Sequence, residues 1–382
     1  GSFKLNMKYF TYLHGLRMTG KRFEKLFGIP RRLPESKLEQ VHMDLARSVQ
    51  VVTEKIMLLT ARHVHEQTGE KYLCLAGGVS LNCVGNGRLL RESPFDDIWI
   101  QPASGDAGGA LGAALFAWYQ YLDQPRAVEP GGRDMQHGSY LGPVFEAEEI
   151  QRYLESKKIP HHRVADDQIA ATGAKLINDG KVLGWFQGRM EFGPRALGSR
   201  SILGDARRRD MQKTMNLKIK YREGFRPFAP SVLGEACPDY FEQDRPSPYM
   251  LMVAPVVEKE RKPLPEGYEK MEMFDRLYVQ RSNIPAITHV DFSARIQTVH
   301  EKTNPRYWRL IKTFQERHGC GLVVNTSFNV RGEPIVCTPR DAYRCFMRTE
   351  MDHLVLGDCV FDKDRQPEWV EEGDWRDEYE LD

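Results

Sequence analysis

This 382-residue sequence lacks an excess of charge of either sign, and that is its most informative absence. Lysine and arginine number 54 and aspartate and glutamate 53, which gives a net charge of +1 at pH 7. Proteins held on nucleic acid or on an anionic membrane by bulk charge are strongly basic. The balance therefore argues against nucleic acid as a partner, although it leaves room for a local basic patch.

Cysteine is scarce, and its spacing carries no metal-binding or redox pattern. The seven cysteines include no Cys-x-x-Cys pair and stand mostly among apolar residues. Such cysteines are typical of reduced core side chains, so we expect a cytoplasmic protein. No run of about 18 apolar residues occurs, which excludes an ordinary membrane-spanning helix. The opening residues GSFKLNMKYF lack the pattern of a signal peptide.

The apolar pattern predicts an α/β protein in two parts. It indicates an amphipathic helix over 38–67, ended by Gly69, with a stripe formed by Val41, Leu45, Val49, Val52, Ile56 and Leu59. Two strand–glycine turn–helix units follow it. A stretch rich in proline, glycine and charge over 124–138 predicts a linker. We therefore expect one domain over 1–125 and a second over 126–382.

The two glycine-rich turns are candidates for phosphate binding. A glycine turn before a helix exposes backbone N–H groups, and the helix dipole favours anions there. The candidate residues are Gly77, Gly78, Gly108 and Gly109. Asp106 in the second turn would repel a phosphate unless a cation lay between them, which makes it a candidate metal ligand. Tight helix–strand packing and helix capping explain the same residues equally well.

A third segment, GRMEFGPRALGSRSIL over 188–203, combines arginines with glycines and apolar residues. Arg189, Arg195 and Arg200 lie within it, beside the single acid Glu191. Arginine binds phosphate oxygens in a bidentate manner, so the segment predicts an anion-binding loop. The alternative is a structural loop whose arginines pair with local acids.

Two further segments place polar residues at alternate positions. In NLKIKYREGFRPF, Lys220 and Arg222 alternate as side chains on one face of a strand do, and Arg226 follows them. The alternative is a solvated basic edge strand.

In VVNTSFNVRGEP, alternate polar residues close a β-rich run. These residues are Asn325, Ser327 and Asn329. Small polar groups at the end of a strand suit an anion or a nucleotide ribose. The alternative is a turn that uses asparagine and glycine for local backbone reasons.

Taken together, these segments resemble the NodU/CmcH family of O-carbamoyltransferases. The resemblance covers almost the whole chain, through LNMKYF, HMDLARSVQVVTEKI, LCLAGGVSLNCVGNG, PASGDAGGALGAA, GRMEFGPRALGSRSIL, REGFRPFAPSV and VNTSFNVRGEPIV. It implies part of an actin-like ATPase-fold domain, followed by a YrdC-like α/β domain with a twisted mixed sheet. YrdC-type enzymes carry Lys-x-Arg and Ser-x-Asn motifs, which correspond here to Lys220/Arg222 and Ser327/Asn329.

The resemblance implies a reaction in two steps. Carbamoyl phosphate and ATP, with Mg²⁺, give carbamoyl-adenylate and pyrophosphate, and the carbamoyl group then moves to a hydroxyl of a small-molecule acceptor. Lys220, Arg222 and Arg195 would be catalytic. The expected nucleotide contacts are Arg226, Arg295 from THVDFSARIQTV, Asn325, Ser327, Asn329 and the four glycines of the turns.

Other functions stay open at this point. A threonylcarbamoyl-adenylate synthase-like enzyme for tRNA modification is one alternative, and a nucleotide-binding fragment without turnover is another. The sequence leaves the acceptor and the oligomeric state, a homodimer included, undecided.

The resemblance also implies a metal, typically iron. Family members carry an amino-terminal lobe whose His-x-x-x-His motif supplies most of the ligands, and this sequence starts after that motif. His63 and His65 do not replace it, because side chains two apart on a helix face different directions. We expect His63 in the core and His65 at the surface. Only Asp106 matches a family ligand, so we expect a carboxy-terminal fragment that holds iron weakly or not at all.

Overall fold

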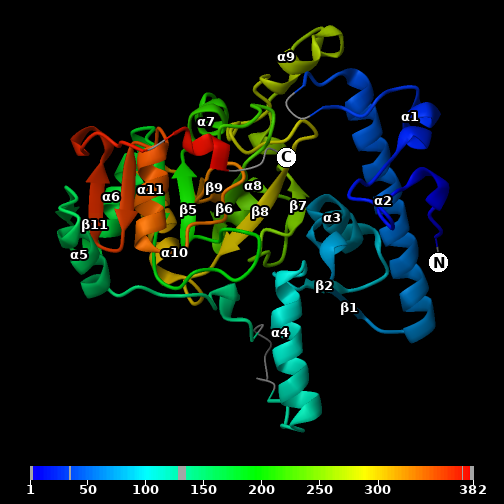
Figure 1. Ribbon diagram of the computed structural model, residues 1–382, viewed down its shortest axis with the longest axis horizontal. Coiled ribbons are helices and arrows are strands. Elements are labelled where there is room, and N and C mark those ends of the chain that lie inside the picture. The colour runs from blue at the N-terminus through cyan, green and yellow to red at the C-terminus, as the bar shows by residue number, and fades with distance from the viewer. Residues whose placement is uncertain (1–2, 34–35, 128–134, 372, 379–382) are drawn as a thin grey trace. The chain divides into compact units, whose positions relative to one another are not determined.

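The computed structural model describes residues 3–33, 36–127, 135–371 and 373–378, and part of the predicted linker lies outside them (Figure 1). The helices are α1 Lys21–Phe27, α2 Gln40–Thr68, α3 Cys83–Glu92, α4 Ala107–Phe116, α5 Ala147–Ser156, α6 Asp166–Asn178, α7 Met211–Thr214, α8 Cys237–Tyr240, α9 Met273–Leu277, α10 Pro305–His318 and α11 Pro339–Arg348. The strands are β1 Tyr72–Leu75, β2 Asp97–Ile100, β3 His162–Arg163, β4 Leu183–Phe186, β5 Arg200–Gly204, β6 Ala229–Leu233, β7 Met252–Pro255, β8 Ser293–Val299, β9 Leu322–Ser327, β10 His353–Leu356 and β11 Cys359–Asp362. The mixed α/β class is confirmed.

The chain divides into two compact units. The first contains Gly1–Leu73 and Arg88–Asp97, and the second contains Cys74–Gly87 and Ile98–Tyr379. The predicted domain boundary at 125/126 stays a prediction.

The first unit is built on the predicted long helix, α2, which ends at Gly69 in the left-handed conformation. The expected apolar stripe is wrong, because Val49 and Val52 are 63% and 56% exposed. The buried residues of α2 are Glu54, Leu58 and Ala61 instead, and Glu54 accepts a hydrogen bond from Arg88 at 2.8 Å. The two histidines are also reversed, with His63 exposed and His65 half-buried.

The second unit is organised by a nine-stranded mixed sheet in the order β3-β11-β10-β4-β5-β9-β6-β8-β7. The pairs β10–β4 and β6–β8 are parallel, and the other neighbours are antiparallel. Helices α6 and α10 pack against each other on one face, and α11 covers the opposite face (Figure 1). The sheet is therefore buried on both faces, and its central strands β4, β5 and β6 are buried at every position.

The strand directions bring three loops to one edge of this sheet. Phe186 at the end of β4 pairs with Arg200 at the start of β5, and Ser201 pairs with Ser327 at the end of β9. Ala229 at the start of β6 pairs with Asn325. The segments 187–199, 220–228 and 328–337 therefore meet at one edge, although they are far apart in the sequence.

The strand expected around Lys220 is wrong. Residues Met211–Thr214 form α7, which continues as the π-helical turn Met215–Ile219, and Lys220 follows directly after it. Met211, Met215 and Ile219 recur every four residues and are all buried, which is a helical spacing. This period explains why the segment is a helix rather than an edge strand.

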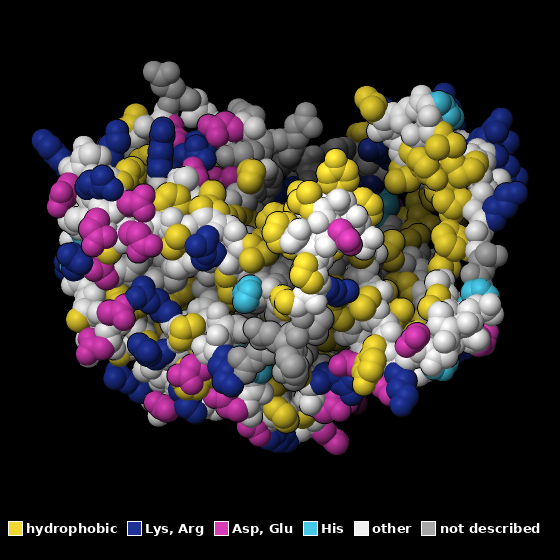
Figure 2. Space-filling model, turned by 90° about the horizontal axis from the view of Figure 1, so that it is seen from below, with side chains coloured by type: hydrophobic (Ala, Val, Ile, Leu, Met, Phe, Trp, Pro, Cys, Tyr) yellow, Lys and Arg dark blue, Asp and Glu magenta, His cyan; other side chains and the backbone are white. Residues whose placement is uncertain are grey.

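Helix α4 carries large apolar side chains that are exposed. Leu115 and Phe116 at its end are 45% and 66% exposed. Hydrophobic side chains gather in the middle of the face shown in Figure 2. Among the described residues, none of the helices combines the length and the apolar character that a bilayer crossing requires.

Gly198 offers a test of the packing between loop and sheet. Its φ is +104°, and a Cβ at this position would lie 2.1 Å from the Tyr307 ring of α10. Gly198→Ala should therefore lower the free energy of unfolding by about 2 kcal/mol or more, since both backbone strain and overpacking oppose it. Gly109→Ala is the matched control, because no atom lies within 4 Å of its Cβ position and it lies in helix α4. Equal midpoints of urea unfolding for the two variants would contradict this packing.

Candidate functional site

Lys220 lies at the centre of a group of oxygen atoms supplied by the end of β9 and the residues after it. Its Nζ donates to the carbonyl oxygens of Ser327 and Asn329, the latter at 2.8 Å, and to Asn329 Oδ1 at 2.7 Å. Ser327 Oγ in turn donates to Asn329 Oδ1 at 2.7 Å. Lys220 thus joins the two motifs, which lie more than a hundred residues apart in the sequence. Arg222 donates to Asn216 instead, and a single pocket formed by all four motif residues stays a prediction.

The ammonium group of Lys220 is poorly compensated. The side chain is buried, and burial followed by the positive charge of Arg222 lowers the pKa of Lys220 to about 7. The atoms around Nζ are neutral oxygens rather than a carboxylate. Lys220 is therefore only partly protonated near neutral pH, and an anion bound beside it would favour the protonated form.

Four arginines extend this positive region. Burial, then Arg226 and Arg295, lower the pKa of Arg222 to about 10. Burial, then Arg295, lower the pKa of Arg195 to about 10. Each arginine therefore lies within electrostatic reach of another. We call Lys220, Arg195, Arg222, Arg226 and Arg295 the cationic cluster.

Few acidic groups neutralise the cationic cluster. Arg226 pairs with Glu223 at 3.1 Å, whereas Arg222 Nε donates to the neutral Asn216 Oδ1 at 2.8 Å. In the described part of the chain, the Nε atoms of Arg195 and Arg295 are buried without a hydrogen-bond partner. Cations whose donors are buried without partners are costly, so the cluster has the electrostatics of a site prepared for an anion.

His289 adds a neutral group beside Arg295. Burial, together with the positive charge of Arg295, lowers the pKa of His289 to about 4, although the negative charge of Asp291 acts in the opposite direction. Its Nδ1 lies 3.0 Å from Ser293 Oγ, which donates to Asp291 at 2.6 Å. His289 is thus uncharged at neutral pH and adds nothing to the repulsion.

The loop 188–203 is organised by Glu191, whose role the sequence did not reveal. Glu191 is buried, and its Oε1 accepts from the backbone N–H groups of Leu197 at 2.7 Å, Ser199 at 2.6 Å and Arg200 at 3.2 Å. The carboxylate therefore stabilises the backbone of the loop. This fixes the loop that carries Arg195. The alternative, in which the arginines of the loop pair with local acids, does not describe Glu191.

Only one arginine of this loop belongs to the cationic cluster, which corrects the expectation for the other two. Arg189 is exposed and donates to the Gly142 carbonyl at 2.9 Å. Arg200 is fully buried, stacks 3.5 Å from the centre of the Phe186 ring, and donates to backbone carbonyl oxygens. Both have structural partners, and Arg195 is left as the arginine available to a ligand.

Asn325 is not exposed to a ligand, so its expected role is corrected as well. It is fully buried, and its Nδ2 donates to the Ala196 carbonyl at 3.1 Å and to Ser231 Oγ at 2.9 Å. Gln297 donates to the neighbouring Leu197 carbonyl at 2.8 Å. These buried amides support the backbone on the carboxy-terminal side of Arg195.

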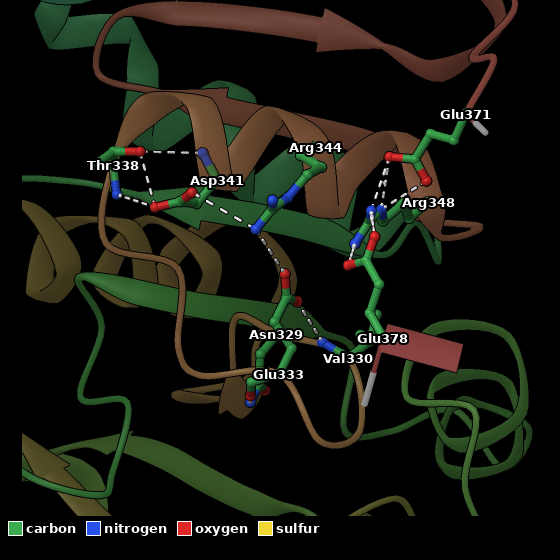
Figure 3. Close-up of polar contacts among 9 residues, drawn as sticks. All are labelled: Asn329, Val330, Glu333, Thr338, Asp341, Arg344, Arg348, Glu371 and Glu378. Carbon is green, nitrogen blue, oxygen red and sulfur yellow. Dashed lines mark hydrogen bonds and ion pairs between the residues drawn. The ribbon is translucent and has the colours of Figure 1, made fainter. Parts of the chain in front are cut away.

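A second support holds the segment around Asn329 (Figure 3). Asn329 Nδ2 donates to the Glu333 carbonyl at 2.6 Å, and Glu333 Oε2 accepts from the Val330 N–H at 3.0 Å. Arg344 of α11 lies 3.6 Å from Glu333. Helix α11 thus anchors the turn that presents Asn329 to Lys220.

The glycines of the two glycine-rich turns differ in the space that a Cβ atom would have. A Cβ on Gly108 would lie 2.2 Å from the Ala103 carbonyl oxygen, so this glycine is required for close backbone packing. Gly77, Gly78 and Gly109 have no atom within 4 Å of a Cβ position. Their nucleotide contacts stay predictions.

The residues present do not fit the metal that the resemblance implies. Asp106 is exposed at the start of α4 and forms no capping hydrogen bond. The described residues contain no group of three or more His, Cys, Asp or Glu side chains suited to a metal ion. One exposed carboxylate is a weak ligand set, so we derive no step through a metal.

A cavity of about 510 Å³ lies at the amino-terminal ends of α5, α6 and α10. Arg189 of the predicted anion-binding loop lines it, but no member of the cationic cluster does. Its other arginine, Arg306, is already satisfied by Gln187 at 2.7 Å and by Asp166. In the described part of the cationic cluster, the Nε atoms of Arg195 and Arg295 lack such partners, so the cluster is the stronger candidate site.

Two family models match this chain. The model described as Carbamoyltransferase N-terminus matches residues 1–115, and Carbamoyltransferase C-terminus matches residues 174–363. The chain is 59% identical to the uncharacterized protein sll1178 of Synechocystis, over 100% of this chain and 62% of that protein. It is 41% identical to nodulation protein NolO of Bradyrhizobium diazoefficiens, over 83% of this chain and 54% of the relative. The chain thus spans only part of these relatives.

Solved structures give more distant matches. HypF in the phosphate- and nucleotide-bound form aligns with a TM-score of 0.33 and 15% identity, over 70% of this chain and 39% of HypF. Sua5 of P. abyssi, complexed with L-threonine, aligns with a TM-score of 0.31 and 14% identity, over 52% of this chain and 48% of Sua5.

Substitutions at Glu191 test how this loop is held. Glu191→Ala should lower the free energy of unfolding by about 3 kcal/mol or more, since three buried N–H groups lose their acceptor. Glu191→Gln retains an oxygen for them and should cost about 1 kcal/mol or less. Thermal and urea unfolding of the two variants measure this, and equal losses would show that charge, not acceptance by Oε1, is what matters.

Proposed function

Since this chain belongs to the carbamoyltransferase family, we propose that it forms carbamoyl-adenylate at the cationic cluster, as part of an ATP-dependent O-carbamoyltransferase. The carbamoyl group would then pass to a hydroxyl of a small-molecule acceptor. In this proposal residues 126–382 are a YrdC-like adenylate-forming domain, and residues 1–125 belong to the actin-like ATPase-fold domain of the second step.

The observation that carries the proposal is the cationic cluster itself. Arg222 lowers the pKa of Lys220, and Arg295 lowers the pKa of both Arg195 and Arg222, so these positive charges repel one another without a ligand. ATP and carbamoyl phosphate are polyanions, and arginine together with lysine is the usual protein surface for phosphate. Binding them relieves this repulsion.

The proposed chemistry balances with one water molecule. Water cleaves carbamoyl phosphate and releases inorganic phosphate and carbamate. A carbamate oxygen then attacks the α-phosphorus of ATP, the bond to the β,γ-phosphates breaks, and pyrophosphate leaves. Negative charge develops on the departing pyrophosphate, and preorganised cations lower the barrier by stabilising it.

The roles within the cationic cluster follow from position. Lys220 is fixed by Ser327 and Asn329, so it presents a single point charge at the end of β9. Arg222 and Arg195 bring planar groups with several N–H donors, suited to the phosphates of ATP with Mg²⁺. Arg226 and Arg295 supply additional positive charge, and Arg295 acts on both Arg195 and Arg222.

Arg195→Ala tests the phosphate contact. Each charge-assisted contact is worth roughly 1.5–3 kcal/mol, so carbamoyl-adenylate formation should fall about ten- to a hundredfold. The measurement is exchange of labelled pyrophosphate into ATP in the presence of carbamoyl phosphate. Arg189→Ala, an exposed arginine of the same loop, is the matched control and should exchange at the wild-type rate.

Lys220→Ala completes this test. It should reduce exchange at least as strongly as Arg195→Ala, because Lys220 is the residue of the first motif that is hydrogen-bonded to both Ser327 and Asn329 of the second. An unchanged rate would refute the assignment. Binding of ATP without exchange in the wild type would favour the nucleotide-binding alternative instead.

The pH dependence of ATP binding tests the charge on Lys220. With a pKa of about 7, Lys220 is protonated below pH 7 and loses its charge as the pH rises. The dissociation constant for ATP should therefore increase between pH 7 and pH 9. In Lys220→Arg the charge persists, so the dependence should flatten. Calorimetric titrations measure both, and because any ionisation of ATP is common to the two proteins, parallel profiles would contradict the assigned pKa.

A further inference from the structure

The carboxy-terminal segment contacts the residue that lies between Lys220 and Arg222. Trp375 forms an edge-to-face contact with the Tyr221 ring, with the ring centres 5.4 Å apart. The Tyr221 hydroxyl donates to the Arg348 carbonyl oxygen at 3.1 Å. Both contacts hold Tyr221 from the side of α11 and the carboxy-terminal segment.

Arg348 anchors this segment through two carboxylates (Figure 3). Its Nε lies 3.0 Å from both oxygens of Glu371, and its two terminal nitrogens donate to Glu378 at 3.0 and 2.9 Å. The Arg348 side chain is only 3% exposed, and its guanidinium lies 5.4 Å from the centre of the Trp375 ring. Bidentate pairs of this kind fix orientation as well as distance.

Tyr221 has a backbone conformation that needs such support. Its φ is +48°, in the left-handed region that side chains other than glycine rarely adopt. Conformations of this kind persist only where the surroundings hold them. The flanking amides are hydrogen-bonded, from Lys220 to the Met215 carbonyl at 2.9 Å and from Arg222 to the Asn216 carbonyl at 3.1 Å. The turn at Tyr221 therefore decides where both cationic side chains point.

We propose that Glu371, Trp375 and Glu378, held by Arg348, form a carboxy-terminal clamp that positions Lys220 and Arg222 for the anionic ligand. The clamp residues are positioning residues, because they act through Tyr221. Their effect on turnover rests on the proposed function, whereas their effect on the turn at Tyr221 does not.

Trp375→Ala is the central test, and Trp369→Ala is its matched control. Trp369 lies on the same carboxy-terminal segment but packs edge-to-face on Tyr343, with ring centres 5.9 Å apart. Hydrogen exchange at the amides of Lys220 and Arg222 should become about tenfold faster or more in Trp375→Ala, as local opening is favoured. It should stay at the wild-type rate in Trp369→Ala, and Trp375→Phe should restore most of the protection.

Pyrophosphate exchange, measured on the same variants, tests the effect of the clamp on turnover. Trp375→Ala should change KM for ATP or kcat by about tenfold or more, since small misplacements of binding groups have large effects on rate. Trp369→Ala should leave both unchanged, although both variants lose a tryptophan.

The outcomes separate the clamp from the proposed function. Equal hydrogen exchange at 220–222 in the two alanine variants would overturn the clamp, whatever the activity. Faster exchange confined to Trp375→Ala supports the clamp even if the wild type forms no carbamoyl-adenylate, a result that would refute only the proposed function. Faster local exchange with unchanged KM and kcat in an active enzyme would also overturn the positioning role.

Discussion

Repulsion among closely placed, partly buried cations is the constraint that the second unit has to satisfy. Lys220 and Arg222 are separated by one residue, and burial together with neighbouring positive charge lowers the pKa of each. A flexible chain would separate such groups and expose them. That they remain together at one sheet edge means that the surrounding structure is rigid enough to oppose the repulsion.

This rigidity comes mainly from groups that add no opposing charge to the cationic cluster itself. Glu191 directs its carboxylate at backbone N–H groups, and the amides of Asn325 and Gln297 hold the carbonyls of residues 196 and 197. Farther out, Arg348 satisfies the acids of the carboxy-terminal segment. These acids therefore bind other groups rather than Arg195 or Lys220, so the cationic cluster keeps its attraction for an anion.

The sequence predicted the parts of this arrangement that repeat a short chemical pattern. The family resemblance relates Lys220 to Ser327, because each stands in a short motif that is visible in the sequence. The helix before Lys220 was missed, although Met211, Met215 and Ile219 carry its four-residue period. Glu191 could not be assigned, since a buried acid that binds backbone amides has no periodic signal and depends on where a folded loop turns.

The loop that carries Arg195 also joins the two regions that the family models match separately. Gly193 has a φ of +135°, and a Cβ there would lie 3.1 Å from the Pro102 carbonyl oxygen, so its backbone passes directly over the second glycine-rich turn. Under the proposed function, carbamoyl-adenylate is a mixed anhydride that water destroys, and it has to reach an acceptor first. Under this proposal, close packing between the loop and the second glycine-rich turn would shorten that path. The same close packing that makes glycine necessary at 193 would therefore also protect the intermediate.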